Sequence, residues 1–341
     1  MCWYLAMTGV MDSFGRPLRE LRVSVTDRCN FRCGYCMPAE LFGPGYAFLP
    51  GEELLTFDEI ERVARIAVSQ GVGKVRLTGG EPLLRRGIED LVAQLACIPG
   101  LDDLAMTTNG TMLAHKAETL ALAGLQRVTV SLDALDAEIF GRMNGTGADV
   151  TRVLAGIEAA WVFGLPVKIN AVIRRGWNDG EILPLAEWAR ERGITLRFIE
   201  YMDVGETNGW RREEMVPAEE ILSVLRREWR MDEIPGGRAG GTALRFRHAD
   251  GGAEVGIIAS VTRPFCGDCA RSRLSADGRW FTCLFAGSGH DLKPMLRGGA
   301  SDAVITAAVR GVWSARDDRY SELRGVDGTL QRKAEMSYLG G

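Results

Sequence analysis

Two stretches of the sequence decide the fold, VTDRCNFRCGYCMP at residues 25–38 and LTGGEPLLR at residues 77–85. Each begins with strand-forming residues and passes at once into a segment rich in cysteine, glycine or proline, so each marks the end of a strand. A helix-like segment, FDEIERVARIAVSQ (57–70), lies between them. Strand, helix and strand in this order predict a parallel βαβ unit with a right-handed crossover.

The same alternation of strand-like and helix-like segments continues to about residue 200. The predicted strands are residues 21–26, 74–78, 103–108, 127–132, 167–173 and 195–202, and the predicted helices are residues 57–70, 86–96, 114–123, 150–163 and 181–193. Six strands are too few for a closed eight-stranded barrel. We therefore predict an α/β fold: an incomplete (β/α)6 barrel at residues 13–210 and a smaller C-terminal α+β domain at residues 211–341, after a flexible segment at residues 1–12.

Polar residues at every second position distinguish these strands from ordinary buried parallel strands, which are continuously apolar. They are Arg22, Ser24 and Thr26, then Arg76 and Thr78, Thr129 and Ser131, and Lys168 and Asn170. Because side chains alternate along a strand, each set points to one face of the sheet. A polar lumen that holds a polar ligand explains the pattern; mutual satisfaction of these side chains inside the core is the alternative.

The composition is that of an ordinary globular protein. The chain has 341 residues, of which 46% are hydrophobic and 25% charged, and its net charge is −4 from 41 basic and 45 acidic residues. This balance argues against non-specific nucleic-acid binding, which needs a basic excess. No run of eighteen apolar residues occurs, so we expect no membrane span and a cytoplasmic location.

Eight cysteines contain the clearest functional signal, because six of them form two groups of three. Cys29, Cys33 and Cys36 have the spacing C-x3-C-x2-C, and the second group is Cys266, Cys269 and Cys283. In a reducing compartment we expect metal ligands or catalytic thiols rather than disulfides. Cys97, in the helix-like segment LVAQLAC, is predicted to be a buried core thiol.

Three cysteines are one ligand short of a structural zinc site, which is normally closed by four. For the second group His290 is the nearest candidate for a fourth ligand, so a Cys3His zinc site is one interpretation. The other is an iron–sulfur cluster, whose irons are held by cysteine thiolates. Three thiolates on a four-iron cluster leave one iron without a protein ligand, and an open metal position can bind a substrate.

The first half of the chain resembles the radical S-adenosylmethionine (radical SAM) superfamily. The residues that carry the resemblance are C-x3-C-x2-C with Tyr35 before the last cysteine, LTGGEPLLR at 77–85, TTNG at 107–110, SLD at 131–133 and RFIEYM at 197–202. The resemblance implies a 4Fe-4S cluster on Cys29, Cys33 and Cys36, with S-adenosyl-L-methionine (SAM) bound at its open iron. The residues implied to contact SAM are Tyr35, Gly80, Ser131 and Met202.

The chain as a whole resembles the radical SAM branch that cyclises GTP in molybdenum cofactor biosynthesis. The marks are Cys266, Cys269 and Cys283, the Arg271 and Arg273 between them, and the C-terminal Gly340-Gly341. The resemblance implies a second 4Fe-4S cluster whose open iron binds the guanine ring. The implied GTP-binding residues are Arg22, Arg76, Thr107, Lys168, Arg271 and Arg273, and Gly340 and Gly341 are implied to reach into the active site as catalytic residues.

The implied reaction is that of a lyase. A 5′-deoxyadenosyl radical removes hydrogen from the ribose 3′ carbon, which then attacks guanine C8 to form a cyclised GTP. The resemblance further implies an external one-electron reductant, a downstream cyclic pyranopterin monophosphate synthase and room for a homodimer. Two alternatives remain at this stage: another radical SAM enzyme with one auxiliary cluster, and a non-catalytic zinc or iron–sulfur module.

Overall fold

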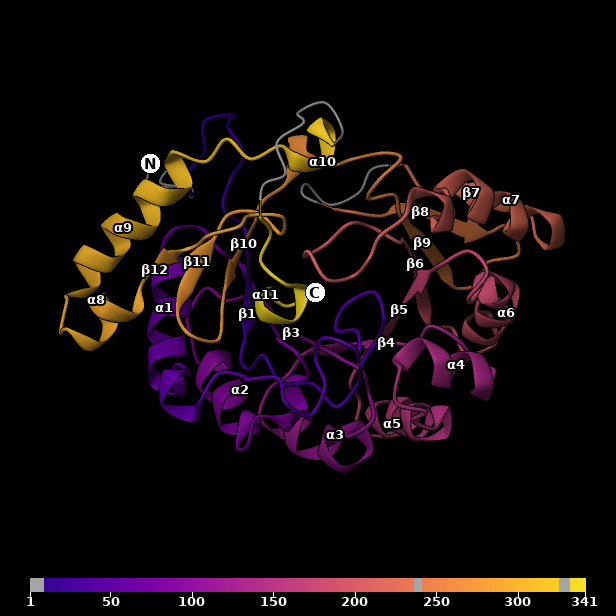
Figure 1. Ribbon diagram of the computed structural model, residues 1–341, viewed down its shortest axis with the longest axis horizontal. Helices are drawn as coiled ribbons and strands as arrows, with labels where there is room; N and C mark the ends of the chain where they lie inside the picture. Colours follow the sequence, from indigo (N-terminus) through magenta and orange to yellow (C-terminus); the bar gives the residue numbers. More distant parts are fainter. Residues whose placement is uncertain (1–8, 236–240, 325–331) are drawn as a thin grey trace, which may run out of the picture.

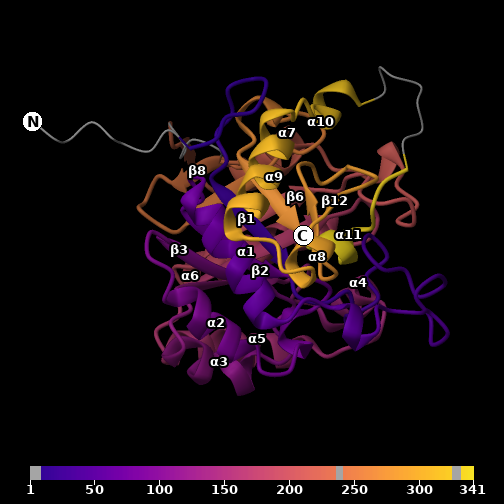
Figure 2. The same cartoon turned by 90° about the vertical axis from the view of Figure 1, so that its left-hand side faces the viewer.

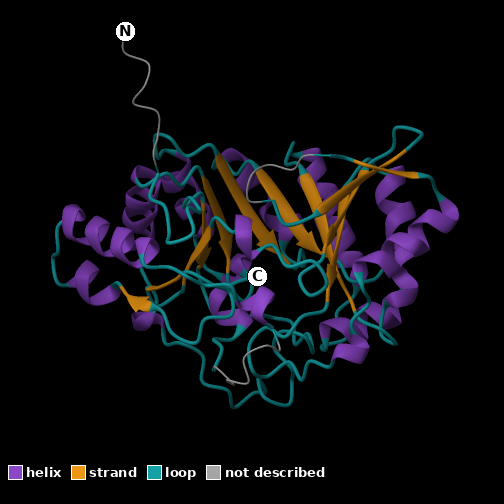
Figure 3. Ribbon diagram, turned by 90° about the horizontal axis from the view of Figure 1, so that it is seen from above, coloured by secondary structure: helices purple, strands orange, loops and turns teal. Residues whose placement is uncertain are grey.

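The computed structural model describes residues 9–235, 241–324 and 332–341, and its centre is one curved sheet (Figures 1 and 3). Six consecutive strands run parallel in chain order through the middle of this sheet. They are β1 (Glu20–Ser24), β2 (Lys74–Thr78), β3 (Asp103–Thr108), β4 (Arg127–Ser131), β5 (Val167–Ile173) and β6 (Thr195–Glu200). The predicted α/β partial barrel is therefore confirmed.

Helices cover the outer face of this curved sheet (Figure 1). They are α1 (Phe57–Ser69), α2 (Ile88–Ala96), α3 (Leu113–Leu122), α4 (Ala137–Asn144), α5 (Val150–Val162), α6 (Ile182–Glu191) and α7 (Ala218–Glu228). Helix α1 begins where the sequence supplies a capping box, in which the Thr56 side chain accepts from the Glu59 amide and the Glu59 side chain accepts from the Thr56 amide. The short helix α4, which Asp136 caps, was not predicted.

The C-terminal part of the chain extends both edges of the same sheet. Strand β10 (Arg271–Leu274) pairs parallel with β1, and β9 (Glu254–Ile258) pairs parallel with β6. Antiparallel strands continue outward on each side, namely β11 (Arg279–Phe281) and β12 (His290–Asp291) beyond β10, and β8 (Leu244–His248) and β7 (Met231–Glu233) beyond β9. The residues predicted as a second domain thus flank the mouth of the barrel from two sides.

Four further helices follow within the described residues (Figure 2). They are α8 (Lys293–Arg297), α9 (Asp302–Ser314), α10 (Tyr320–Leu323) and α11 (Met336–Leu339). Helix α9 packs beside α1 at the left of Figure 1, whereas α11 and the C-terminus lie in the middle of the molecule. The chain end therefore lies close to the C-terminal ends of the central strands.

The structure bears on two further expectations, one about the N-terminal segment and one about Cys97. Of the N-terminal segment expected to be flexible, residues 1–8 lie outside the described residues, whereas Val10 and Asp12 are buried. The prediction of a buried Cys97 is wrong, since Cys97 is exposed. It caps the end of α2 at a point where the helix stops, so the apolar helical face that contains Leu91 and Leu95 does not extend to it.

Apolar side chains between the sheet and the outer helices form the main core. Leu21, Val23, Val75, Leu77 and Val128 are fully buried on the strands. Because alternate residues of the same strands point the other way, the inner face of the curve is left to polar side chains. Within the described ranges, no helix has the length and apolar character needed to cross a membrane.

Candidate functional site

The first cysteine group lies in the loop that leaves the C-terminal end of β1 (Glu20–Ser24). A tight turn forms there, because the amides of Cys36 and Met37 both donate to the Cys33 carbonyl, at 2.9 and 2.8 Å. The Phe31 amide lies 3.4 Å from the Cys29 sulfur. Carboxyl ends of parallel barrel strands are where active sites form, so this loop occupies the expected position.

Two glycines allow the loop after β2 to lie directly against the cysteine loop. The Gly80 amide donates to the Thr26 carbonyl at 2.7 Å, and the Glu81 amide donates to the Arg28 carbonyl at 2.8 Å. A Cβ atom at Gly79 would overlap the Thr26 carbonyl oxygen, and one at Gly80 would overlap that of Arg28. The sequence predicted that these glycines let a ligand approach the backbone. Their lack of a side chain is also needed for the contact between the two loops.

Acidic groups surround the first cysteine group. Burial raises the pKa of Cys33, and the carboxylate of Asp133 raises it further. Burial likewise raises the pKa of Cys29 to about 11, with Glu81 adding to the shift. Free thiolates are disfavoured here, so bound cationic iron would be needed to hold these cysteines as thiolates.

The hydroxyl of Tyr35 makes a second, unexpected contact in this loop. It donates to Asp133 Oδ2 at 2.6 Å, while Asp133 Oδ1 accepts from the Val172 amide at 2.8 Å. Burial raises the pKa of Asp133 to about 6, against the hydrogen bonds from Tyr35 and Val172, which lower it. The SLD segment therefore orients the cysteine loop through Asp133, a role that the sequence did not indicate.

The second cysteine group lies at the edge of the sheet beside β1. Cys266 opens a short 3-10 turn (Cys266–Asp268), and the Cys269 amide donates to the Cys266 carbonyl at 3.1 Å. Cys283 follows β11 (Arg279–Phe281). Burial acts to raise the pKa of Cys269, but the guanidinium groups of Arg271 and Arg316 outweigh it and lower that pKa to about 6.

A single zinc ion is not favoured at this second group. His290 lies in β12 and its side chain is exposed, and within the described part of the chain no three His, Cys, Asp or Glu side chains are arranged to hold one metal ion. Tetrahedral zinc with Zn–S bonds near 2.3 Å needs its sulfur ligands about 4 Å apart. A cubane of four irons is larger and has more widely spaced ligands, and it fits three half-buried thiols without other side-chain ligands.

Basic side chains from the central strands meet in the lumen of the partial barrel. Arg76 Nη1 donates to Thr107 Oγ1 at 2.9 Å and to Thr129 Oγ1 at 3.1 Å, which joins β2, β3 and β4. Arg22 and Arg273 occupy paired positions on β1 and β10, and Lys168 pairs in register with Thr129. The structure thus brings together the residues predicted to bind GTP on the strands.

Several of these basic side chains have a nitrogen atom that lacks a hydrogen-bond partner in the described part of the chain. Among the described residues the buried Nε atoms of Arg76, Arg197 and Arg273 have no hydrogen-bond partner. Burial lowers the pKa of all three arginines and neighbouring arginines lower it further, while the Glu20 carboxylate opposes this shift at Arg76 and Arg197. Buried cations that repel one another are costly unless an anion joins them, so the lumen fits a polyanionic ligand.

Arg197 was not among the predicted binding residues. Its Nη2 lies 3.4 Å from Thr129 Oγ1, beside Arg76. The signal was present in the sequence, because Thr195 and Arg197 extend the alternation of polar residues to the sixth strand, TLRFIEYM. Asn170 is a second candidate, since its Oδ1 is buried without a partner within the described ranges.

The remaining predicted residues lie near the mouth of the barrel. Ser131 ends β4 and pairs in register with Asn170 on β5, and Met202 follows β6. Arg271 is buried with its Nη2 3.4 Å from the Cys269 sulfur. Arg271 therefore lies next to the second cysteine group, as its place between the ligands predicted.

The C-terminal glycines reach the loop after β2. Thr78 Oγ1 donates to the Gly341 carbonyl at 3.3 Å, and Gly340 is buried with φ +73°. A Cβ atom at Gly340 would overlap the Thr78 side chain. Upstream, Tyr338 donates to Asp277 Oδ1 at 2.6 Å and Thr207 donates to Glu335 Oε2 at 2.7 Å, so both sides of the mouth hold the tail in place.

Comparisons with known families divide the chain into two matched regions. Residues 23–189 match the family model of the radical SAM superfamily, and residues 194–322 match that of the Molybdenum Cofactor Synthesis C family. The boundary between these matches falls just before β6 (Thr195–Glu200), so the second match includes the last of the six central strands.

Curated relatives match along almost the whole chain. A protein of Acidothermus cellulolyticus named GTP 3′,8-cyclase is 52% identical over 97% of this chain and 99% of its own length. Proteins of the same name from Xanthomonas axonopodis pv. citri and Staphylococcus epidermidis are 48% and 44% identical, over 98% and 97% of this chain and 100% and 99% of their own. Among solved structures, Streptococcus suis SuiB bound to S-adenosylmethionine shares the fold, with a TM-score of 0.62 at 15% identity over 95% of this chain and 77% of that chain.

Proposed function

The chain belongs to the GTP 3′,8-cyclase family of radical SAM enzymes, and we propose that it converts GTP to (8S)-3′,8-cyclo-7,8-dihydroguanosine 5′-triphosphate, the first step of molybdenum cofactor biosynthesis. The C3′–H bond breaks and a C3′–C8 bond forms, and one electron and one proton replace the hydrogen that leaves C3′; we place this carbon–carbon bond-forming enzyme among the lyases. The chain is then an enzyme that uses SAM and iron–sulfur chemistry.

The lumen is the observation that most favours a nucleoside triphosphate as substrate. Arg76, Arg197 and Arg273 have buried Nε atoms without partners among the described residues, so they offer hydrogen bonds as well as charge. Guanidinium groups bind phosphate oxygens through paired N–H donors. The triphosphate of GTP is the polyanion of the proposed reaction that these donors would bind. Arg22, Thr107 and Lys168 add donors to the same chamber.

Cys29, Cys33 and Cys36 would hold the first 4Fe-4S cluster, and Tyr35, Gly80, Ser131 and Met202 would line the SAM site. When bound, the cluster and SAM supply a 5′-deoxyadenosyl radical. The contact between Tyr35 and Asp133 keeps the loop in one orientation. SAM carries positive charge, which the nearby carboxylates of Glu81 and Asp133 complement.

Cys266, Cys269 and Cys283 would hold the second 4Fe-4S cluster, with one iron free for the guanine ring. Arg271 and Arg273 lie between two of these ligands in sequence and are buried, so they would fix the orientation of the nucleotide. Holding the ribose and the base together in one pose is what brings C3′ within reach of C8.

The proposed reaction requires electrons at two points. Loss of the 3′ hydrogen and formation of the C3′–C8 bond leave a nucleotide radical, and one electron and one proton complete the product. Reductive cleavage of SAM consumes another electron. We therefore include an external one-electron reductant among the partners.

Gly340 and Gly341 would close the reaction chamber from the mouth. Their contact with Thr78 places them beside the Gly79-Gly80 turn, where SAM is proposed to bind. A chamber closed by backbone excludes water from radical intermediates without adding a reactive side chain. A homodimer and a downstream cyclic pyranopterin monophosphate synthase complete the proposed partners.

Anaerobic iron and sulfide analysis tests the number of clusters. Reconstituted chain is expected to contain about eight irons and a similar amount of sulfide, four at each group of three cysteines. Zinc without sulfide would overturn the proposal. Four irons would leave only a single-cluster radical SAM enzyme.

Turnover with SAM, reductant and GTP tests the substrate. We expect 5′-deoxyadenosine and cyclised GTP to form together, and little 5′-deoxyadenosine to form without GTP. Equal formation of 5′-deoxyadenosine in the absence of GTP would contradict the proposed substrate and favour another radical SAM enzyme with an auxiliary cluster.

A further inference from the structure

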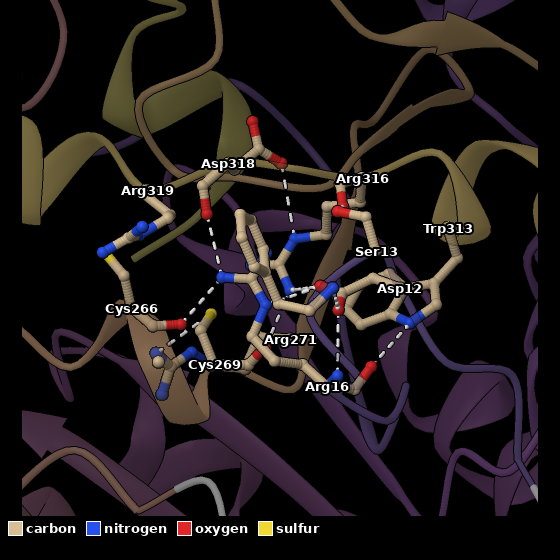
Figure 4. Close-up of polar contacts among 12 residues, drawn as sticks. Asp12, Ser13, Arg16, Cys266, Cys269, Arg271, Trp313, Arg316, Asp318 and Arg319 are labelled. Atoms are coloured by element: carbon tan, nitrogen blue, oxygen red, sulfur yellow. Dashed lines mark hydrogen bonds and ion pairs between the residues drawn. The ribbon is translucent and has the colours of Figure 1, made fainter.

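A buried ion triad lies behind the second cysteine group and is used by none of the roles described above. Asp12, Arg16 and Arg316 form it, and their side chains are 0%, 3% and 1% exposed. Asp12 Oδ2 accepts from Arg16 Nε at 2.6 Å and from Arg316 Nη1 at 3.1 Å (Figure 4). One carboxylate therefore joins two guanidinium groups that come from opposite ends of the chain.

Both arginines also donate to the backbone of the cysteine loop. Arg16 Nη1 donates to the Cys266 carbonyl at 2.8 Å, and Arg316 Nη1 donates to the Cys269 carbonyl at 2.7 Å. These are the two cysteines of the C-x2-C turn (Figure 4). The triad thus holds the two ligands at a fixed separation from behind.

The indole of Trp313 supports the triad from α9. Its Nε1 donates to the Arg16 carbonyl at 3.2 Å, and the Arg316 guanidinium lies 4.6 Å from the centre of the ring. Trp313 is fully buried, so neither arginine can turn away easily. Asp318 adds a weaker, partly exposed ion pair to Arg316 at 3.3 Å.

A buried triad of this kind is a poor source of stability alone. Desolvation of two cations and an anion offsets most of their attraction, and apolar residues of similar size often stabilise a core more. Its position and charge are what distinguish it. Groups that orient and polarise metal ligands from behind tune both the retention and the potential of a metal centre.

We propose that Arg16 and Arg316, joined by Asp12, brace the Cys266–Cys269 loop and raise the reduction potential of the second cluster above that of the first. The inference rests on the proposed second cluster. A reduced cluster carries one more negative charge than the oxidised form, and nearby buried cations favour it. At the first group a single arginine among the described residues donates to a cysteine carbonyl, Arg32 to that of Cys29 at 2.8 Å, and the carboxylates of Glu81 and Asp133 lie near the thiols.

A redox titration of the second cluster alone tests the charge. The full chain with Cys29, Cys33 and Cys36 replaced by alanine would retain only this cluster, which can be followed by its visible absorbance and its electron paramagnetic resonance signal. In this background R316Q is expected to lower the ratio of reduced to oxidised cluster at a fixed potential at least tenfold, a shift of about 59 mV for one electron.

Lysine at position 316 separates charge from geometry. R316K keeps the charge but not the forked donor, so we expect the potential to stay near that of the parent while a chelator removes iron faster. R16Q is expected to shift the potential in the same direction as R316Q. R62Q is the matched control, because the Arg62–Asp302 ion pair at 2.7 Å joins α1 to the start of α9 without touching a cysteine.

Several results would overturn this inference. One is an unchanged potential in R316Q at full iron content, and another is an equal shift in R62Q. A potential in R316K as low as in R316Q would show that charge is not the cause. An iron count of four in the unmodified chain would instead reject the second cluster itself, and so the proposed function, before any potential is compared.

Discussion

The two groups of three cysteines have the same kind of side chain but differ in the charges that surround them. Around the first group burial raises the pKa of Cys29 and Cys33, with Glu81 and Asp133 adding to the shift. At the second group arginines bring the pKa of Cys269 down to about 6 in spite of burial, whereas burial and the Asp318 carboxylate raise the pKa of Cys283. This difference in charge agrees with the proposal that cationic SAM binds beside the first group and anionic GTP beside the second.

The largest expected effect comes from removing one ligand at each end. Cys33→Ala should lose about half of the iron and Cys269→Ala the other half, since each cluster depends on its own three thiolates. Neither variant should form product. Iron and sulfide analysis with a product assay measures both, and exposed Cys97→Ala serves as the control that keeps all iron. Loss of all iron from either variant would mean that the two groups do not act as separate sites.

The second largest effect is expected where the tail meets the first half of the site. Gly340→Ala would place a Cβ atom against Thr78 and force a residue with φ +73° into a strained backbone. Displacement of the tail by about 1 Å should lower kcat on the order of 100-fold, with iron content unchanged.

Gly299→Ala is the matched control for that tail variant. Gly299 has a similar φ of +76° but no atom within 4 Å of a built Cβ, so its substitution tests backbone strain alone. Turnover in Gly340→Ala equal to that in Gly299→Ala would remove the tail from the active site.

A third test uses the cation excess in the lumen. Arg197→Met should raise the KM for GTP about tenfold, because one phosphate contact is lost. The same change should stabilise the metal-free chain by about 1 kcal/mol, because a buried cation without an ion-pair partner among the described residues is removed. Arg127 differs, since it makes two hydrogen bonds to Asp103 at 2.9 and 2.8 Å.

Arg127→Met should therefore destabilise the metal-free chain by about 1–2 kcal/mol, as a carboxylate loses its partner. Urea unfolding of both variants measures the two signs. The same sign for both would show that the lumen has no cation excess.

The last test concerns the pH dependence of stability at the floor of the lumen. Lys74 shares the carboxylate of Glu20 with Arg22 and Arg76, and burial lowers the pKa of Lys74 to about 8. Between pH 8 and about 10.5 the unfolded chain binds more protons at this lysine than the folded chain. Stability due to Lys74 should therefore increase with pH across that window, by about 2–3 kcal/mol.

Lys74→Met should lose this increase. Urea unfolding of metal-free chain at pH 8 and pH 10 compares the variant with the parent, and Lys116→Met, which removes a surface ion pair to Glu89, provides the control. A parent chain with no greater increase than Lys74→Met would show that this amine is not desolvated.

Local patterns in the sequence predicted the parts of the fold that depend on neighbouring residues. The central strands and the helices between them were found within a few residues, because periodicity and turn residues act over short distances. Helix α4 (Ala137–Asn144) escaped since it has only eight residues and contains Gly141, which has low helix propensity. The exposed position of Cys97 was missed because the helix ends at Ala96. A residue just past the end of a helix no longer follows the helical periodicity that would place it on the buried face.

The site shows the same division between local and distant information. The spacing of Cys29, Cys33 and Cys36 predicts a metal-binding loop, and the polar alternation along the strands predicts the lumen. The contact of Tyr35 with Asp133 spans 98 positions, and that of Asp12 with Arg316 spans 304. No local pattern reports such pairs.

By itself the sequence determined the order of strands and helices, the two sets of thiols and the rows of polar side chains on alternate strand positions, because spacing along a chain sets which residues share a turn or a face. Only the tertiary structure decided which charges surround each set of thiols. Those charges come from segments hundreds of residues apart, and their effect depends on burial and distance in space, which are set only when the curved sheet brings both ends of the chain to its mouth.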